Sequence, residues 1–173
     1  MKELPTFYYH DHFIEFLSFI KAQCAHLLHP MHSAFISEFE KAPMPEQALL
    51  VRCINRKQSA IKSASLIFKE LNDIDELIFK LIKRAWLKLP TQNDASLLLR
   101  CLTKDELFQL CITHGDNNAI RKSLPKAPLL AAAKQIPNES IAASDVASGY
   151  LVRNCDHVID YFLYLYFGNC RDR

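Results

Sequence analysis

Glycine is scarce in this chain, and its scarcity limits the structures that the sequence can form. Only three glycines occur among 173 residues. Glycine most readily takes the left-handed backbone of tight turns, and it lets a backbone approach a phosphate closely. The sequence therefore predicts few β-hairpins, and it nearly excludes a glycine-rich phosphate-binding loop.

Long hydrophobic runs are also missing. The longest uninterrupted apolar run lies at residues 161–167, well short of the roughly 20 residues that a transmembrane helix needs. The first six residues contain no apolar core of a signal peptide. We therefore expect a cytoplasmic protein that does not associate with a membrane.

Cysteines and histidines are present, but not at the spacings of a metal site. No Cys-x-x-Cys pair occurs, and the cysteines within apolar periodic segments are read as reduced core residues: Cys24, Cys53, Cys101, Cys111 and Cys155. Five histidines crowd the N-terminal region: His10, His12, His26, His29 and His32. A zinc site competes here with plain polar helix faces, which we favour because helical residues two apart diverge.

The sequence also lacks the arrangements that enzymes use. There is no Gly-x-Ser-x-Gly, and no strand carries an Asp followed by Glu-x-Lys, the arrangement that holds a nuclease metal. Carboxylates cluster at residues 73–76 and 105–106, where a first helical turn explains them. We therefore expect no catalytic residue and no metal or cofactor in this chain.

The N-terminal half alternates helical patterns with short extended stretches. Apolar spacing predicts helices over residues 7–28, 30–39, 46–56 and 74–85, the last capped by Asp73. A short strand is expected at 66–68, and a small wing is expected to begin at 86–89, before Pro90. This order predicts a winged helix-turn-helix-like unit over residues 1–92, in a mostly α fold.

A second helical unit is expected over residues 93–136. Thr103 and Glu106 form a capping box that starts a helix, and Gly115 is placed to end it. After a polar loop at 116–123, Lys126 opens a shorter helix. The pair resembles a SAP-like module, a small DNA-binding helical hairpin, so Arg121, Lys122 and Lys126 are candidate DNA contacts.

The remaining chain, residues 137–173, combines two predictions. The polar, Ala/Ser-rich stretch 137–148 predicts a loop or linker. Residues 155–167 predict a helix that is apolar on every side and needs burial on every side. Either this helix fills the core of the domain, or its partner surface belongs to domains beyond this chain.

Net charge is only +2, so a nucleic-acid surface must appear as a local cluster. Arg52, Arg56, Lys57 and Lys62 lie together, with no acidic residue between Glu46 and Glu70. Such a cluster suits a phosphate backbone, although cations also favour a helix C-terminus. Tyr8 and Tyr9 are candidates to pack on a sugar or base, or alternatively to form a hydrophobic staple for the first helix.

The sequence resembles the N-terminal region of the Fanconi-associated nuclease family over nearly its whole length. The matching stretches are Phe7-Tyr8-Tyr9 with Phe13, Gln47-Ala-Leu-Leu-Val-Arg52, Asn55-Arg56-Lys57, Lys62, Leu66, Phe68-Lys69-Glu70-Leu71, Leu102-Thr-Lys-Asp-Glu-Leu107 and Tyr166-Phe167-Gly168-Asn169.

The resemblance implies a metal-dependent, structure-specific DNA repair nuclease whose VRR-NUC catalytic domain, with Mg or Mn, would lie outside this chain. The chain is then expected to be a fragment that binds flap, branched or end-containing DNA and contacts the remaining domains of its parent protein. The alternative is a helical protein-interaction scaffold that uses the apolar C-terminal helix as its interface.

Overall fold

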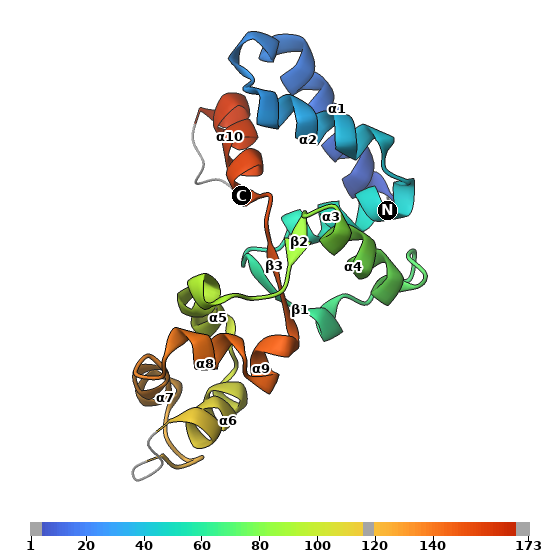
Figure 1. The fold of residues 1–173 in the computed structure, drawn as a ribbon. Helices are drawn as coiled ribbons and strands as arrows, with labels where there is room; N and C mark the ends of the chain where they lie inside the picture. The colour runs from blue at the N-terminus through green and yellow to red at the C-terminus, as the bar shows by residue number, and fades with distance from the viewer. Residues whose placement is uncertain (1–4, 116–119, 169–173) are drawn as a thin grey trace, which may run out of the picture. The chain divides into compact units, whose positions relative to one another are not determined.

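The computed structural model describes residues 5–115 and 120–168, and helices dominate it (Figure 1). The predicted mostly α class is confirmed. Internal contacts divide the chain into two compact units. The first comprises Met1–Lys57, Ile67–Leu87 and Arg153–Arg173, and the second comprises Gln58–Leu66 and Lys88–Val152. The predicted boundaries 1–92, 93–136 and 137–173 stay a prediction.

The first unit packs its helices through aromatic side chains. Its helices are α1 (Tyr8–Gln23), a 3-10 turn (Ala25–Leu27), α2 (Pro30–Lys41), α3 (Met44–Ile54), α4 (Ile74–Lys83) and α10 (Asp156–Phe167). The ring centroid of Phe39 lies 5.1 Å from that of Phe13 and 6.1 Å from that of Trp86. Phe39 and Phe162 are fully buried. Phe35 of α2 also contacts Phe162 of α10, so α1, α2, α10 and the segment after α4 share one aromatic core.

The apolar helix α10 is only partly enclosed. Phe162 is fully buried, whereas Tyr164, Tyr166 and Phe167 are 54%, 44% and 51% exposed. One side of the helix thus fills the core of the first unit, as one of the two predicted alternatives requires. The other side presents aromatic rings to solvent.

The second unit is a group of short helices around a leucine-rich core. Its elements are β1 (Ala60–Lys62), a 3-10 turn (Ser63–Ser65), a second 3-10 turn (Gln92–Asp94), α5 (Ala95–Cys101), α6 (Lys104–His114), α7 (Lys126–Ala133), α8 (Asn138–Ala142) and α9 (Asp145–Ser148). Leu107 of α6 and Leu129 of α7 are fully buried in that core. The predicted capping box at Thr103 and the helix end at Gly115 are both confirmed.

The loop or linker predicted at 137–148 is wrong, because α8 and α9 lie there. Ile141 and Ala147 are buried in the core of the second unit. Ser144 caps α9 by accepting a hydrogen bond from the backbone N–H of Ala147. Small side chains in this stretch allow the short helices to pack closely. The same composition is also typical of a linker, so composition alone did not predict these helices.

A small sheet joins strands that lie far apart in the sequence. Its order is β1-β3-β2, with β2 at Leu87–Lys88 and β3 at Tyr150–Arg153. β1 and β3 are antiparallel, and Ala60 lies opposite Val152. The strand predicted at 66–68 is wrong: the strand lies at 60–62, where Ala60 and Ile61 are buried. The expected extended segment after Trp86 is confirmed as β2.

The predictions for the cysteines and for the helix start at Asp73 are confirmed with two exceptions, one at Cys101 and one at the Asp73 side chain. Cys24, Cys53, Cys101, Cys111 and Cys155 are free, and all except Cys101 are buried. α4 begins directly after Asp73, as predicted. The Asp73 side chain makes no capping hydrogen bond, however, and its backbone is left-handed with φ of 51°.

His32 is buried at the start of α2, where its side chain caps the helix. Its Nδ1 accepts a hydrogen bond from the backbone N–H of His29 at 3.1 Å. Its ring stacks on Tyr161 of α10, with 4.3 Å between centroids and 5° between planes. Burial lowers the pKa of His32, and the neighbouring His29 and His157 lower it further. Protonation would remove the acceptor that caps the helix.

We expect the protein to lose stability as the pH falls below about 6.5, the pKa of histidine in an unfolded chain. The unfolded state then binds a proton that the native His32 resists. Urea denaturation at pH 7.5 and 5.5 measures the difference. His32→Phe keeps a ring on Tyr161 but cannot be protonated, so the difference should shrink. His114→Asn, at an exposed position, should leave it unchanged; an equal pH effect in wild type and His32→Phe would contradict this role.

Candidate nucleic-acid interface

Two of the predicted basic residues, Arg56 and Lys57, lie on the turn that follows α3. Both are exposed. α3 ends at Ile54 with Asn55 as its C-cap, so the cations stand where the negative end of the helix dipole favours them. This turn carries positive charge at the surface of the first unit.

A buried arginine that the sequence did not reveal holds this turn. One guanidinium nitrogen of Arg153 donates to the backbone carbonyl oxygens of Cys53, Ile54 and Arg56, at 3.0, 2.6 and 2.9 Å. The carbonyls at a helix end lack partners within the helix, and Arg153 supplies one. Its Nε also pairs with Asp156 at 2.9 Å, and its side chain is 1% exposed. Arg153 therefore fixes the backbone that presents Arg56 and Lys57.

Arg52 is bound within the first unit. It forms an ion pair with Glu70, and its guanidinium carbon lies 3.8 Å from the ring centroid of Tyr9. The Tyr9 hydroxyl donates to the same carboxylate at 3.1 Å. Burial would raise the pKa of Glu70, but the hydrogen bonds from Arg52 outweigh it and lower the pKa. The charge of Arg52 is thus largely balanced, and the face of the buried Tyr9 ring is covered.

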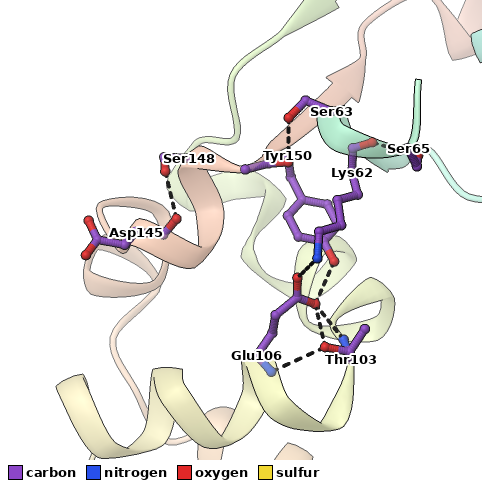
Figure 2. Close-up of polar contacts among 9 residues, drawn as sticks. Lys62, Ser63, Ser65, Thr103, Glu106, Asp145, Ser148 and Tyr150 are labelled. Atoms are coloured by element: carbon purple, nitrogen blue, oxygen red, sulfur yellow. Dashed lines mark hydrogen bonds and ion pairs between the residues drawn. The ribbon is translucent and has the colours of Figure 1, made fainter. Parts of the chain in front are cut away.

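Lys62 belongs to the second unit, where it pairs with Glu106. Figure 2 shows Lys62, Thr103 and Tyr150 converging on the Glu106 carboxylate. Lys62 Nζ and the Tyr150 hydroxyl donate at 2.7 and 2.8 Å, and the backbone N–H and hydroxyl of Thr103 both donate at 2.8 Å. Burial opposes ionisation of Glu106, yet these donors lower its pKa to about 2. Much of the charge of Lys62 is therefore balanced by an ionised carboxylate.

The other predicted basic residues also lie in the second unit. Arg121 and Lys122 precede α7, Lys126 is its first residue, and all three are exposed. Residues 116–119 of the predicted loop lie outside the described residues. α6 and α7 pack as the predicted helical pair, through Cys111 and Leu129, whose carbonyl accepts from the Cys111 thiol at 3.5 Å. These three cations remain candidate DNA contacts of the second unit.

A pocket of about 740 Å³ opens beside the Arg56–Lys57 turn, entirely within the first unit. Its walls come from α1, from the end of α3 and from α10. Aromatic, aliphatic and polar side chains share the lining: Tyr8, Tyr9, His12, Phe13, Phe16, Val51, Ile54, Asn55, Arg56, Lys57, Ile159, Leu163, Tyr166 and Phe167. The lining thus combines apolar side chains with two cations, and it brings the predicted Tyr8, Tyr9, Arg56 and Lys57 together.

Residues 7–88 match the family model "FAN1, HTH domain". This part of the chain is therefore similar to the FAN1 HTH family. The predicted resemblance to the N-terminal region of the Fanconi-associated nucleases is confirmed.

Relatives extend the likeness beyond residue 88. The Fanconi-associated nuclease 1 homolog of Pseudomonas aeruginosa is 30% identical over 166 residues, which cover 94% of this chain and 29% of that protein. A crystal structure of paFAN1 bound to 2nt 5′ flap DNA with a gap matches with a TM-score of 0.79 and 28% identity, over 99% of this chain and 32% of that one. A second, bound to 1nt 5′ flap DNA with a gap, has a TM-score of 0.75 and 29% identity, over 97% and 31%.

The likeness confirms the predicted fold class, a winged helix-turn-helix-like unit followed by a small helical unit. The chain spans about three tenths of the length of these relatives.

Among residues 5–115 and 120–168, no three His, Cys, Asp or Glu side chains are placed to hold a metal ion. No helix in that part of the chain has the length and apolarity to cross a membrane.

Proposed function

We propose that this chain is the DNA-binding region of a structure-specific, metal-dependent DNA repair nuclease, and that it positions branched or flap DNA for a nuclease domain. The observation that carries the proposal is the structural likeness to paFAN1 bound to flap DNA. Divalent metal, Mg or Mn, would act in the nuclease domain. Phosphodiester cleavage is assigned to no residue of this chain.

The charge distribution favours the Arg56–Lys57 turn over α4 as the principal DNA contact of the first unit. The start of α4 carries Asp73, Asp75 and Glu76, all exposed, and these carboxylates would repel a phosphate backbone. Arg56 and Lys57 stand on a fixed turn and offer cations without sequence preference. We infer that DNA lies against this turn and that Tyr8 lies beside the DNA. Arg52 would support this surface from within the first unit.

The second unit would add backbone contacts through Arg121, Lys122 and Lys126. Lys62 would contribute only where a phosphate competes with Glu106 for its ammonium group. Tyr9 is assigned a structural role, because its ring lies under Arg52.

Replacing Arg56 and Lys57 together by alanine is expected to weaken binding of flap DNA and to flatten its salt dependence. Each phosphate contact on duplex DNA contributes roughly −0.9 to the slope of log affinity against log salt concentration. The double variant should therefore lose up to about two units of slope. Fluorescence anisotropy with flap, duplex and single-stranded DNA at several salt concentrations measures this.

Lys41→Ala with Lys83→Ala is the matched control, because it removes two exposed cations that do not line the pocket. Its salt slope should stay close to that of the wild type. A folded Arg56→Ala/Lys57→Ala protein with unchanged affinity and slope would remove this turn from the interface.

A protein-interaction scaffold is the second candidate function, and the exposed aromatic side of α10 favours it. Tyr166 meets Phe19 of α1 with 4.8 Å between ring centroids and Phe167 with 4.7 Å. Absence of salt-dependent DNA binding by the wild-type chain would leave this candidate as the better account.

A further inference from the structure

The pocket beside the Arg56–Lys57 turn has a composition that a DNA backbone does not need. A phosphate backbone requires cations and hydrogen-bond donors. This pocket adds a lining of aromatic and aliphatic side chains, and its volume of about 740 Å³ falls within the roughly 300–1,000 Å³ range of small-molecule sites. We propose that it holds one unpaired nucleotide of the bound DNA, with the base stacked on aromatic rings and its phosphate held by Arg56 and Lys57. The proposal rests on the DNA-binding function proposed above.

The rings that would stack on the base are those with accessible faces. Phe16 and Tyr8 are half-buried on α1, and Tyr166 and Phe167 are 44% and 51% exposed on α10. Tyr166 contacts Phe16 edge to face with 5.3 Å between centroids, and Phe19 and Phe167 also contact it. A base would therefore stack on the part of the Tyr166 ring that stays exposed. Every base has a π-face, so aromatic stacking tolerates any sequence.

Charge complementarity identifies a nucleotide rather than an apolar peptide segment as the occupant. The lining changes from apolar residues such as Ile159 and Leu163 to Asn55, Arg56 and Lys57 at the turn after α3. A nucleotide has the same polarity, with a flat base at one end and a negative phosphate at the other. The exposed amide of Asn55 offers a further hydrogen-bond donor to the phosphate.

Only an unpaired nucleotide can use such a site. Within a duplex, both faces of a base are covered by its stacked neighbours, and only its edges are accessible in the grooves. A flap, a gap edge or an extrahelical position frees a face for stacking on protein rings. The pocket would therefore allow the chain to distinguish DNA with an unpaired nucleotide from continuous duplex.

The test compares two DNAs that differ by one nucleotide. One is a duplex with a single unpaired 2-aminopurine at a flap, and the other is the same nicked duplex with every base paired. Stacking in the pocket should quench the 2-aminopurine fluorescence when the wild-type chain binds. Tyr166→Leu with Phe167→Leu should weaken binding of the unpaired DNA about 5- to 150-fold, with little effect on the paired DNA.

Tyr164→Leu with Phe79→Leu is the matched control, since it removes two exposed rings that do not line the pocket. Both affinities should then stay at the wild-type level. Equal losses for paired and unpaired DNA in the pocket variant, or no loss for either, would overturn the pocket while leaving DNA binding intact. Failure of the wild type to bind any DNA would overturn the proposed function and the pocket with it.

Photo-crosslinking tests the pocket without a substitution, so a variant that unfolds does not leave the question open. A 5-bromouracil at the unpaired position reacts with aromatic side chains that stack on it. Crosslinks mapped by mass spectrometry to Tyr8, Phe16, Tyr166 or Phe167 support the proposal. Crosslinks confined to other parts of the chain, or none with bound DNA, would overturn it.

Discussion

Replacing Arg153 by methionine is expected to lower the free energy of unfolding by about 3–5 kcal/mol, the usual cost of removing one partner from a buried ion pair. The change leaves Asp156 without its cation and takes a donor away from three carbonyl oxygens at the end of α3. Methionine fills a similar volume, so the loss reports on polar partners rather than on a cavity. Urea denaturation followed by circular dichroism measures it.

Two further arginine variants separate the causes. Arg121→Met changes an exposed arginine and should alter stability by no more than about 0.5 kcal/mol. Arg153→Lys keeps the charge but lacks the planar fork of donors, so an intermediate loss is expected. If Arg153→Met were as stable as the wild type, the capping role of Arg153 would have to be abandoned.

Acid is expected to destabilise the second unit through Glu106. Its pKa of about 2 lies below the unfolded value near 4.5, so ionised Glu106 stabilises the fold above pH 4.5. That contribution, about 3 kcal/mol at most, is lost as the pH falls from 4.5 towards 2. Denaturation curves collected between pH 6 and 2.5 follow the loss.

Glu106→Gln should be less stable than the wild type at pH 6 and should lose less on acidification. Its amide cannot accept from Lys62, Thr103 and Tyr150 as a carboxylate does. Glu76→Gln provides the control. Lys80 also lowers the pKa of Glu76, but this pair is exposed on α4 and contributes little to stability, so the acid profile of the variant should stay close to that of the wild type. Parallel acid profiles for Glu106→Gln and wild type would show that Glu106 does not carry this effect.

Local patterns predicted the helices and caps well. Apolar spacing located α1 to α4, and the Thr103 capping box located the start of α6, because both depend on residues three or four apart. The same reasoning missed β3 and placed a strand at 66–68. Strands β1 and β3 are stabilised by each other across about 90 residues, a relation that no local pattern contains.

Only part of the candidate interface was predicted from the sequence, because local patterns do not contain contacts between distant residues. Exposed cations at a helix end are visible in the sequence, and Arg56 and Lys57 are found there. The ion pairs that balance Arg52 and Lys62 involve Glu70 and Glu106, which only the fold brings close. The pocket needs α10 beside α1, and Arg153 reaches α3 from 97 or more residues away.

The late position of β3 and Arg153 has a consequence for how the protein is made. During synthesis, residues 7–88 leave the ribosome well before residues 150–153, so β1 has no partner strand and the carbonyls of α3 have no cap. These long-range contacts must wait for most of the chain, and such contacts slow folding. A protein cut after residue 88 would keep the region that matches the FAN1 HTH domain. It would lack strand β3, which pairs with β1, and Arg153, which caps the end of α3. It should expose the edge of β1 and bind to other chains there.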